Sequence, residues 1–460
     1  MTAFKDKSVL VLGLGETGLS MVRWLSLQSA RLRVADSRTA PPGLAKVGAY
    51  VAPEHIYCGN FSDALFEGIE LIAVSPGVPL RDPVVAKAVA SGIEVVGDIE
   101  LFAQSLPKDH RPRILAITGS NGKTTVTSMV QHLCNAAGRD AVAAGNISPA
   151  VLDVVMERGV NQPEVWVLEL SSFQLETTRT LEPDAATVLN ISEDHLDRYA
   201  DAKEYSSAKE QIFSGCAVQV LNRDDARSMN MARPDRKIIT FGLNAPESAS
   251  DFGIVRDAGE IWLVQGNHRL LSAAELQVHG LHNVANALAS LALACAIDFP
   301  MPALLDALRS FKGLPHRVQR VAEKDGVSFY DDSKGTNVGA TIAAMQGLGC
   351  KVVLIAGGDG KGQDFAPLRA VVAEHARAVV LIGRDAPLID AALAGSGVDT
   401  YNALDMNDAV QLAAKLSHTG DAVLLSPACA SFDMYRNYQH RAEVFVQAID
   451  GLAKEKSWAH

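Results

Sequence analysis

Residues 114–125 read ILAITGSNGKTT, and this stretch decides the fold class because a short apolar strand runs directly into a glycine-rich loop. A helical pattern follows the loop to about Ala137 and is closed by Gly138. In such a unit the loop N–H groups and the positive end of the helix face phosphate oxygens, Lys123 can reach the β- and γ-phosphates, and the Thr124 hydroxyl can bind Mg²⁺. The segment predicts a mononucleotide-binding α/β domain.

The loop departs from the full Gly-x-x-x-x-Gly-Lys-[Ser/Thr] pattern at one position, because Ile117 stands where the first glycine is expected. An alternative interpretation is a glycine-rich turn whose lysine is merely solvated. The strand before the loop and the helix after it favour the phosphate-binding interpretation. The predicted nucleotide-binding residues of the loop are Gly119, Ser120, Asn121, Gly122, Lys123, Thr124 and Thr125.

Outward from this loop, short β-branched runs alternate with Ala-rich amphipathic segments along the whole chain, which predicts parallel sheets flanked by helices. Several strands are apolar without alternation, as expected for strands covered on both faces. Strands are predicted at residues 8–12, 32–35, 71–74, 114–118, 165–168, 186–189, 352–356, 378–382 and 422–425.

A chain of 460 residues exceeds what one hydrophobic core usually serves, so several domains are expected. Polar, proline-containing breaks at residues 105–112 and 311–317 divide the chain into three. We expect a Rossmann-like domain at 1–107, a central phosphate-loop domain with a parallel sheet at 108–313, and a Rossmann-like domain at 314–460.

The net charge of −11 argues against nucleic acid as a partner, although backbone amides and a few cations can still hold an acidic small molecule. Six scattered cysteines without a Cys-x-x-Cys pair are typical of reduced thiols in a cytosol. The amino terminus shows no signal-peptide pattern, and the apolar helix near residues 287–297 is too short to span a bilayer. We therefore expect a cytoplasmic monomer without a membrane partner.

Two further segments carry polar residues beyond strand ends, where α/β sheets place their ligands. Glu169 ends the strand VWVLE and can supply the carboxylate that a Mg²⁺–nucleotide site needs, although a surface glutamate is the plain alternative. His195 follows another strand and has three carboxylates within two residues, which indicates a metal or phosphate role over a structural one.

The first strand also precedes a glycine loop, Gly13-x-Gly15-x-x-Gly18, and Asp36 ends the next strand. This pattern fits a dinucleotide site and would by itself suggest an NAD-dependent oxidoreductase. The pattern indicates only a helix amino terminus open to a diphosphate and an acidic residue near a ribose or base. A UDP-sugar contains these same groups, so the pattern does not distinguish it from NAD. Glu16 lies close to the expected diphosphate, which its carboxylate would repel, so we expect only the backbone of Glu16 to contact the ligand.

Taken together, these motifs resemble the Mur ligase family, and within it the members that join D-glutamate to UDP-N-acetylmuramoyl-L-alanine. The similarity extends over nearly the whole chain. Its signals, in the family's order, are TGSNGKTT (118–125), LELSSFQ (168–174), NISEDHLDRY (190–199), LHNVANA (281–287), LPHR (314–317), DSKGTN (332–337) and SPACAS (426–431).

The resemblance implies an ADP-forming ligase of peptidoglycan precursor synthesis. The alanine carboxylate takes the γ-phosphate of ATP to give an acyl phosphate, and the amine of D-glutamate then displaces phosphate. It implies two Mg²⁺ ions, one at Thr124 and Glu169 and another at His195 and a carbamylated Lys209. Burial favours the neutral amine that carbamylation requires, whereas most lysines on helices are plain surface residues.

The resemblance also assigns ligand-binding residues along the chain. With Lys123, the catalytic residues are Glu169, His195 and Lys209. The nucleotide is further assigned to Asn283, Asn286, Arg317 and Asp332. The UDP-substrate is assigned to Gly15, Glu16, Thr17, Asp36, Ser37, Arg38, Ser75, Gly77 and Asn146. D-Glutamate is assigned to Lys334, Thr336, Lys361, Ser431 and Tyr438, the last standing where the family has phenylalanine.

Three alternatives remain at this point. The oxidoreductase depends on the first glycine loop alone. A noncatalytic nucleotide-binding regulator would have no need of Lys123, Glu169, His195 and Lys209. Folylpolyglutamate synthase and the other muramyl ligases share much of the central domain, but residues 426–431 and the absence of an Asp-Asn-Pro-Arg signature favour D-glutamate over diaminopimelate.

Overall fold

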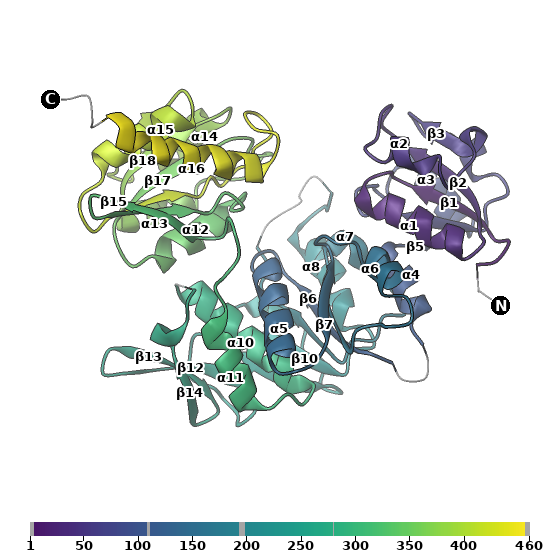
Figure 1. Cartoon of the computed structure of the whole chain (residues 1–460), viewed down its shortest axis with the longest axis horizontal. Coiled ribbons are helices and arrows are strands. Elements are labelled where there is room, and N and C mark those ends of the chain that lie inside the picture. Colours follow the sequence, from purple (N-terminus) through teal and green to yellow (C-terminus); the bar gives the residue numbers. More distant parts are fainter. Residues whose placement is uncertain (1–3, 108–110, 193–197, 279, 456–460) are drawn as a thin grey trace. The chain divides into compact units, whose positions relative to one another are not determined.

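The computed structural model describes residues 4–107, 111–192, 198–278 and 280–455. Helices and mostly parallel strands alternate along it, which confirms the predicted α/β class (Figure 1). The chain divides into two compact units. Unit 1 comprises Met1–Leu271 with Ala287–Leu308, and unit 2 comprises Ser272–Asn286 with Arg309–His460. Among the described residues, no helix is both long and apolar enough to cross a membrane.

The first sheet of unit 1 has five parallel strands in the order β3-β2-β1-β4-β5. Val9 and Val11 of β1 face one core while Leu10 and Leu12 face another, which explains the uninterrupted apolar run. The strand order reverses between β1 and β4, and this point is where such sheets bind ligands. The elements are β1 (Ser8–Leu12), α1 (Glu16–Leu27), β2 (Arg31–Asp36), α2 (Leu44–Val47), β3 (Ile56–Cys58), β4 (Leu71–Val74), α3 (Pro83–Ala90), β5 (Glu94–Val96) and α4 (Asp98–Ser105).

The second sheet of unit 1 is also parallel and has the order β11-β10-β9-β6-β8-β7. Strand β6, which leads into the glycine loop, lies between β8 and β9, and α5 packs over β7 and β8 (Figure 1). The elements are β6 (Arg113–Thr118), α5 (Lys123–Ala136), β7 (Ala141–Gly145), α6 (Val151–Arg158), β8 (Val165–Glu169), α7 (Ser172–Leu175), β9 (Ala185–Val188), α8 (Ala202–Glu210), β10 (Val218–Asn222), α9 (Ala226–Met229) and β11 (Lys237–Phe241).

A small sheet of three strands, in the order β12-β13-β14, follows, and its first two strands are antiparallel. The sequence interpretation did not include this antiparallel element, whose strands are only partly buried and mix polar with apolar residues. The elements here are β12 (Phe252–Asp257), β13 (Glu260–Gln265), β14 (His268–Ser272), α10 (Leu281–Ala296) and α11 (Met301–Ser310).

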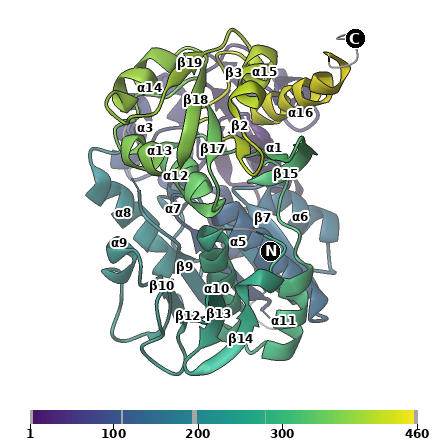
Figure 2. The ribbon, with the colours of Figure 1, turned by 90° about the vertical axis from the view of Figure 1, so that its left-hand side faces the viewer.

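The sheet of unit 2 has the order β15-β16-β20-β17-β18-β19 and is parallel except for the edge strand β15. Helices α12, α13 and α14 pack on one face, and α15 and α16 pack on the other (Figures 1 and 2). The elements are β15 (Gln319–Lys324), β16 (Val327–Asp331), α12 (Val338–Gly347), β17 (Val352–Gly357), α13 (Leu368–His375), β18 (Ala376–Ile382), α14 (Ala386–Leu393), β19 (Thr400–Asn402), α15 (Met406–Leu416), β20 (Ala422–Leu425) and α16 (Tyr438–Glu455).

All nine predicted strands are present, with ends that differ by at most a few residues. The helix predicted after the glycine loop is α5, which ends at Ala136. Short edge strands such as β3, β5 and β19 were not predicted, because three residues carry too little pattern to distinguish a strand from a loop.

Trp166 of β8 is a large anchor of the unit 1 core. Its ring meets that of Phe102 edge to face, with centroids 4.8 Å apart, and both side chains are fully buried. The indole Nε1 has no hydrogen-bond partner among the described residues. The pair joins helix α4 to the sheet that carries the glycine loop.

Replacing Trp166 tests how much this anchor stabilises unit 1. Trp166→Ala is expected to lower the free energy of unfolding by about 3–5 kcal/mol, because it leaves a cavity in a close-packed core. Trp166→Phe is expected to cost less than about 1.5 kcal/mol, since it keeps a ring and removes an unpaired N–H. Urea denaturation followed by circular dichroism measures both, and equal losses would contradict this account.

Candidate active site

The glycine loop after β6 has the backbone conformation that phosphate binding requires. Gly119 has φ of 151° and Gly122 has φ of 84°, both outside the range that L side chains readily adopt. A Cβ on Gly119 would lie 3.1 Å from the Leu189 side chain. Gly122 is the N-cap of α5 and has no side chain to cap the helix, so the first turn presents its N–H groups toward the loop.

Asn190, just beyond β9, braces the loop from the neighbouring strand. Its carbonyl oxygen accepts from Ser120 N at 2.9 Å, and its side-chain Oδ1 accepts from Asn121 N at 2.8 Å. Its Nδ2 donates back to the Asn121 carbonyl at 3.1 Å. Hydrogen bonds to Asn190, at the end of the neighbouring strand, therefore hold the loop in place.

Lys123 Nζ donates to the carbonyl oxygens of Gly119 and Ser120, both at 2.9 Å. The lysine side chain thus folds back across the loop from the first residue of α5. This position places its ammonium group beside the loop backbone, and its role toward a phosphate stays a prediction. Ile117, the departure from the full motif, is fully buried in β6.

Lys209 lies under the same loop. Its side chain is 2 % exposed, and Nζ donates to the Gly119 carbonyl at 3.0 Å and to Thr118 Oγ1 at 3.3 Å. Nζ also lies 4.7 Å from the centre of the Tyr205 ring, and Tyr205 OH is 3.2 Å from Ser120 Oγ. The structure therefore excludes the surface lysine that the sequence left as an alternative.

Glu169 ends β8 beside the loop, and it is 2 % exposed. Its Oε1 accepts from Asn146 Nδ2 at 3.0 Å, whereas Oε2 is buried and has no hydrogen-bond partner among the described residues. A buried carboxylate oxygen without a donor is costly unless a cation lies against it. This carboxylate oxygen would suit a divalent cation, since oxygen donors are the ligands that Mg²⁺ prefers, and the part of Thr124 in such a site stays a prediction.

Backbone packing keeps this carboxylate in place. Gly145 ends β7 with φ of 108°, and a Cβ there would lie 2.3 Å from the Glu169 carbonyl oxygen. The next residue, Asn146, donates its N–H to the same carbonyl at 2.7 Å. The close approach of the two strand ends therefore depends on glycine at position 145.

The histidine cluster predicted as a second metal site lies outside the described residues, because it falls in 193–197. Among the residues that the structure describes, no group of three or more His, Cys, Asp and Glu side chains is arranged to hold a metal ion. The assignment of His195 to a metal stays a prediction.

A cavity of about 190 Å³ in unit 1 collects several of the residues predicted for the UDP-substrate. Glu16 and Thr17 come from the start of α1, and Asn146 comes from the loop after β7. Glu16 Oε1 accepts from Ser148 Oγ at 2.8 Å, and both residues line the cavity, so this bond fixes the position of the Glu16 carboxylate. The full lining is Glu16, Thr17, Pro76, Gly145, Asn146, Ile147, Ser148, Ala150 and Gln174.

Sequence reasoning assigned no role to Ile147, Ser148 or Gln174, although Gln174 lies within the quoted LELSSFQ motif. Gln174 Nε2 donates to Asp98 Oδ2 at 3.0 Å. Burial raises the pKa of Asp98 to about 6, against the hydrogen bond from Gln174 that lowers it. Ile147 and Ser148 directly follow the predicted Asn146 in the chain, whereas only the fold brings Gln174 to the cavity.

Asp36, at the end of β2, holds the first glycine loop. Its Oδ2 accepts from Leu14 N at 2.7 Å, and its Oδ1 accepts from Arg38 N at 2.8 Å and Arg38 Nε at 2.9 Å. Burial opposes ionisation, but the Arg38 guanidinium and the backbone donors outweigh it and lower the pKa of Asp36 to about 2. Asp36 is therefore an anion engaged by Arg38, and Arg38 remains half exposed to meet a ligand.

The same loop closes against β4 through small residues. Ser75 Oγ donates to the Gly13 carbonyl at 3.1 Å, and a Cβ on Gly18 would lie 1.8 Å from that carbonyl oxygen. The helix starts so close to the strand that a side chain at these positions would clash, and this close approach explains the Gly-x-Gly-x-x-Gly pattern. Gly15, Ser37 and Gly77 lie in the loops beside them.

In unit 2, Asp332 follows β16 and is buried. Its Oδ2 accepts from Ser426 Oγ at 2.7 Å and its Oδ1 from Val318 N at 3.3 Å. Burial raises the pKa of Asp332 to about 7, although the Ser426 hydroxyl and the Arg317 charge work in the opposite direction. Of the other residues predicted for the nucleotide, Asn286 Nδ2 donates to Asn283 Oδ1 at 3.2 Å.

The residues predicted for D-glutamate come from the loops after β16, β17 and β20 and from the first residue of α16. Lys334 Nζ lies 5.1 Å from the centre of the Tyr438 ring, and Lys361 Nζ lies 6.0 Å from that of Phe432. Ser431 is buried, whereas Phe432 beside it is exposed. The Tyr438 carbonyl accepts from Ser333 Oγ at 2.8 Å, so the backbone of Tyr438 is fixed independently of its ring.

Arg441 of α16 is a buried residue that sequence reasoning missed. Its Nη2 donates to the Ser333 carbonyl at 2.7 Å, and its Nη1 donates to the Cys429 carbonyl at 3.1 Å. Burial lowers the pKa of Arg441 to about 10. The guanidinium joins the loop that carries Lys334 to the loop that carries Ser431.

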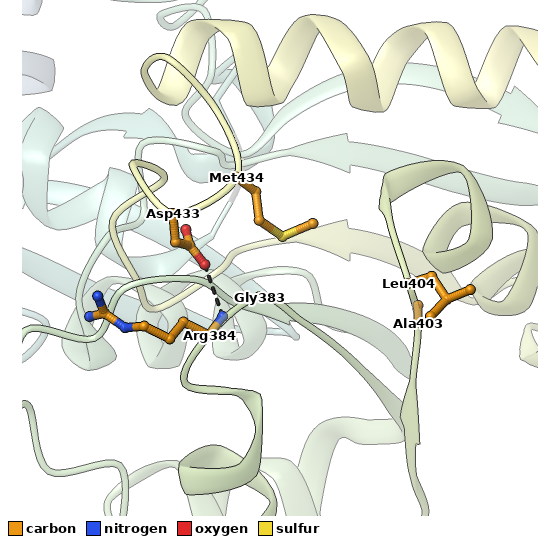
Figure 3. Close-up of a pocket in the computed structure, with 6 residues that line it drawn as sticks. All are labelled: Gly383, Arg384, Ala403, Leu404, Asp433 and Met434. Carbon is orange, nitrogen blue, oxygen red and sulfur yellow. Dashed lines mark hydrogen bonds between the residues drawn. The ribbon is translucent and has the colours of Figure 1, made fainter.

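A broader, open cavity of about 650 Å³ lies farther along the same sheet edge, and no predicted site residue lines it. Its lining residues are Gly383, Arg384, Ala403, Leu404, Asp433 and Met434 (Figure 3). The Arg384 backbone N donates to Asp433 Oδ2 at 2.9 Å, and the Arg384 side chain pairs with Asp359 and Asp385. These bonds join the loop after β18 to the loops after β17 and β20.

Titration of Asp332 has a testable consequence. Its pKa of about 7 in the folded state lies above the unfolded value of 3.8, so the folded chain keeps a proton that the unfolded chain loses. The stability of unit 2 should fall between about pH 4 and pH 7, and Asp332→Asn should remove this part of the fall, on the order of a few kcal/mol. Hydrogen exchange of β16 amides, compared with wild type at pH 5 and pH 7.5, measures the difference.

The control is Asp364→Asn, which changes an exposed aspartate in the same unit. It should leave the pH dependence of exchange at wild-type values. An Asp332→Asn variant that follows the wild-type pH dependence would contradict the assignment.

Three family models match the chain in sequence order. They are the Mur ligase MurD-like N-terminal domain at residues 7–97, the Mur ligase middle domain at 117–294, and the Mur ligase glutamate ligase domain at 316–429. Among solved structures, the chain is similar to a UDP-N-acetylmuramate-alanine ligase from Thermotoga maritima (TM-score 0.59, 19% identity, 96% of this chain and 99% of that chain). It is also similar to a pseudomurein peptide ligase type C from Methanothermus fervidus (TM-score 0.60, 16% identity, 97% and 100%). These two likenesses show the shared three-domain fold.

Sequence relatives are much closer. The chain is 58% identical to the UDP-N-acetylmuramoylalanine--D-glutamate ligase of Methylobacillus flagellatus, over 99% of both chains. It is 57% identical to the enzyme of that name from Aromatoleum aromaticum, over 99% of this chain and 100% of the relative. Identity at this level over the full length, with the phosphate loop, Glu169 and Lys209 gathered in one unit, leaves one conclusion: the chain belongs to the Mur ligase family.

Proposed function

We propose that the protein is an ATP-dependent ligase that joins D-glutamate to UDP-N-acetylmuramoyl-L-alanine in peptidoglycan precursor synthesis. The observation that carries the proposal is the set of Lys123, Glu169 and Lys209 around one glycine loop, in a chain 58% identical over 99% of its length to a ligase of that name. The NAD-dependent alternative accounts for neither the second glycine loop nor these buried groups.

The reaction has two steps in this proposal. A carboxylate oxygen of the L-alanyl group attacks the γ-phosphorus of ATP, the bond from that phosphorus to the β–γ bridging oxygen breaks, and ADP leaves. The amine nitrogen of D-glutamate then attacks the carbonyl carbon of the acyl phosphate. The tetrahedral intermediate expels inorganic phosphate, and the nitrogen loses a proton to give the amide.

The chain contributes positioning and charge rather than a nucleophile. The N–H groups at the start of α5 and the ammonium of Lys123 stabilise charge on the transferred phosphoryl group. The N–H groups of Ser120 and Asn121 donate to Asn190 instead, and these bonds fix the loop before the reaction, so that it need not reorganise as charge develops.

Thr124 and the unpaired Oε2 of Glu169 would hold one Mg²⁺, and His195 with Lys209 would hold a second. A bound Mg²⁺ neutralises phosphate charge and orients the phosphoryl group for in-line transfer. A carbamate on Lys209 would turn a buried cation into an anion suited to that role, and Tyr205 and Thr118 already fix the position of its nitrogen.

The remaining assignments follow the family resemblance and are part of the proposal. Glu16, Thr17 and Asn146, which line one cavity, serve the UDP-substrate together with the loops at Asp36 and Ser75, and Asn146 also donates to Glu169. Unit 2 supplies Asn283, Asn286, Arg317 and Asp332 for the nucleotide, and Lys334, Thr336, Lys361, Ser431 and Tyr438 for D-glutamate. Two lysines match the two carboxylates of the amino acid.

We also propose domain boundaries at 1–107, 108–313 and 314–460, each range containing one matched family model. The expectations of a monomer and of a cytoplasmic location stay predictions. Light scattering of the purified chain measures the first.

ADP formation with UDP-N-acetylmuramoyl-L-alanine and a panel of amino-acid donors tests the function. D-Glutamate should support turnover, and Lys123→Ala should lower kcat by about two to three orders of magnitude, because it removes a cation from the transferred phosphoryl group. Lys203→Ala, an exposed lysine of α8, is the matched control and should retain wild-type rates. Equal rates of ADP formation with all amino-acid donors, or a Lys123→Ala variant with the wild-type rate, would contradict the proposal.

The carbamate on Lys209 has a separate test. Protein incubated with ¹³C-bicarbonate should show a slowly exchanging carbamate carbon signal by NMR, which is absent from Lys209→Ala and present in Lys203→Ala. Lys209→Ala should also lose most activity, since a buried group next to the phosphate loop is gone. A wild-type spectrum identical to that of Lys209→Ala would rule out the modification.

A further inference from the structure

Three loops at the carboxyl end of the unit 2 sheet carry four of the five residues proposed for D-glutamate, and Tyr438 begins α16. The Lys334 loop (residues 332–337) follows β16 and carries Lys334 and Thr336. The Lys361 loop (residues 358–363) follows β17, and the Ser431 loop (residues 426–431) follows β20. A ligand that touches all four residues needs the three loops in fixed register, because none of these residues lies within a helix or strand.

Backbone bonds join two pairs of these loops. Asp359 and Ala430 exchange both N–H···O bonds, at 2.9 and 2.8 Å, and so join the Lys361 loop to the Ser431 loop. Ala428 N donates to the Gly335 carbonyl at 3.0 Å and so joins the Ser431 loop to the Lys334 loop. The third pair, the Lys334 loop and the Lys361 loop, is joined through a side chain.

That side chain is Gln363. Its Oε1 accepts from Val338 N at 3.2 Å, directly after the Lys334 loop, and its Nε2 lies 3.4 Å from the Thr336 carbonyl oxygen. The same Nε2 donates to the Gly360 carbonyl at 3.0 Å and lies 3.4 Å from the Ala428 carbonyl. One carboxamide therefore contacts the backbone of all three loops.

The chemistry of the carboxamide suits this place. Gln363 offers one acceptor and two N–H donors, and the site presents one N–H and three carbonyl oxygens. A glutamate would put two acceptors against those carbonyls, and an apolar side chain would leave them without a donor. Gln363 is half-buried, so water competes only in part for these bonds.

Lys361 needs this support because its backbone is strained. It has φ of 51°, a left-handed conformation that is unfavourable for a residue with a Cβ and persists only when neighbouring bonds fix it. Lys361 N donates to Asp359 Oδ1 at 3.0 Å, and Gly360 N donates to Asp385 Oδ2 at 2.7 Å. Gln363 adds two further bonds to the same turn, because both its backbone N–H and its Nε2 donate to the Gly360 carbonyl.

We propose that Gln363 is a positioning residue for the amino-acid substrate: its carboxamide holds the Lys361 loop against the Lys334 loop, so that both lysines meet the two carboxylates of one D-glutamate. This inference depends on the proposed function for the identity of the ligand. Gln363 does not touch the substrate in this account. It lowers the KM for the amino acid by fixing in advance the residues that do.

Steady-state ADP formation with Gln363→Met tests the proposal, because methionine keeps the size of the side chain and removes its hydrogen bonds. The KM for D-glutamate should rise about tenfold, the equivalent of one to two lost hydrogen bonds, while the KM values for ATP and for the UDP-substrate stay within about twofold. Gln363→Glu should raise the KM for D-glutamate further, because its carboxylate would face three carbonyl oxygens. Gln447→Met, an exposed glutamine of α16, is the matched control and should behave as wild type.

Hydrogen exchange supplies a second measurement that needs no turnover. Gln363→Met should speed exchange in the Lys334 and Lys361 loops and leave strands β17 and β20 at wild-type protection. An unchanged KM for D-glutamate with unchanged exchange would overturn the proposal, as would an equal rise of all three KM values together with a lower Tm, which indicates a general loss of structure. A wild-type enzyme that does not use D-glutamate, in contrast, contradicts the proposed function and leaves the exchange result as the test of the contact.

Discussion

The site depends on one constraint, which is that a short loop must keep its own backbone polar groups satisfied while it presents others to a phosphate. The loop after β6 does so by bonding sideways to Asn190 and by leaving glycine at the cap of α5. A Ser, Asp or Asn at position 122 would satisfy the first turn internally and compete with a ligand. The anion site therefore follows from a missing cap and a strand on each side of β6.

Buried charge is the second recurring theme. Glu169, Lys209, Asp332 and Arg441 are each almost fully removed from water, which is costly for an ionisable side chain unless partners compensate for the lost hydration. Arg441 recovers that cost through bonds to three backbone or hydroxyl oxygens in one unit. Glu169 retains an oxygen without a partner among the described residues, and this difference separates a residue that braces a loop from one that awaits a cation.

The two units solve the same problem with different means. Unit 1 fixes its ligand loops by glycines that allow backbones to approach closely, at a strand end in Gly145 and in the first turn of α1 in Gly18. Unit 2 fixes its loops by side chains that bond to backbone, among them Arg441, Asp433 and Gln363. Hydrogen bonds from such side chains allow the Lys361 loop to keep a strained backbone. In this account, residues that do not touch the ligand also affect how tightly it binds.

The sequence by itself determined the α/β class, the nine principal strands, the phosphate loop and the family, because these depend on local periodicity and on residues close together in the chain. It also indicated that Glu169 ends a strand beside that loop. It could not determine that Lys209 is buried beneath Gly119, that Gln174 and Ser148 line one cavity, or that Gln363 contacts three loops. Those facts bring together residues separated by dozens of positions, and only the order of strands in each sheet and the packing of helices on its faces decide which separated residues meet.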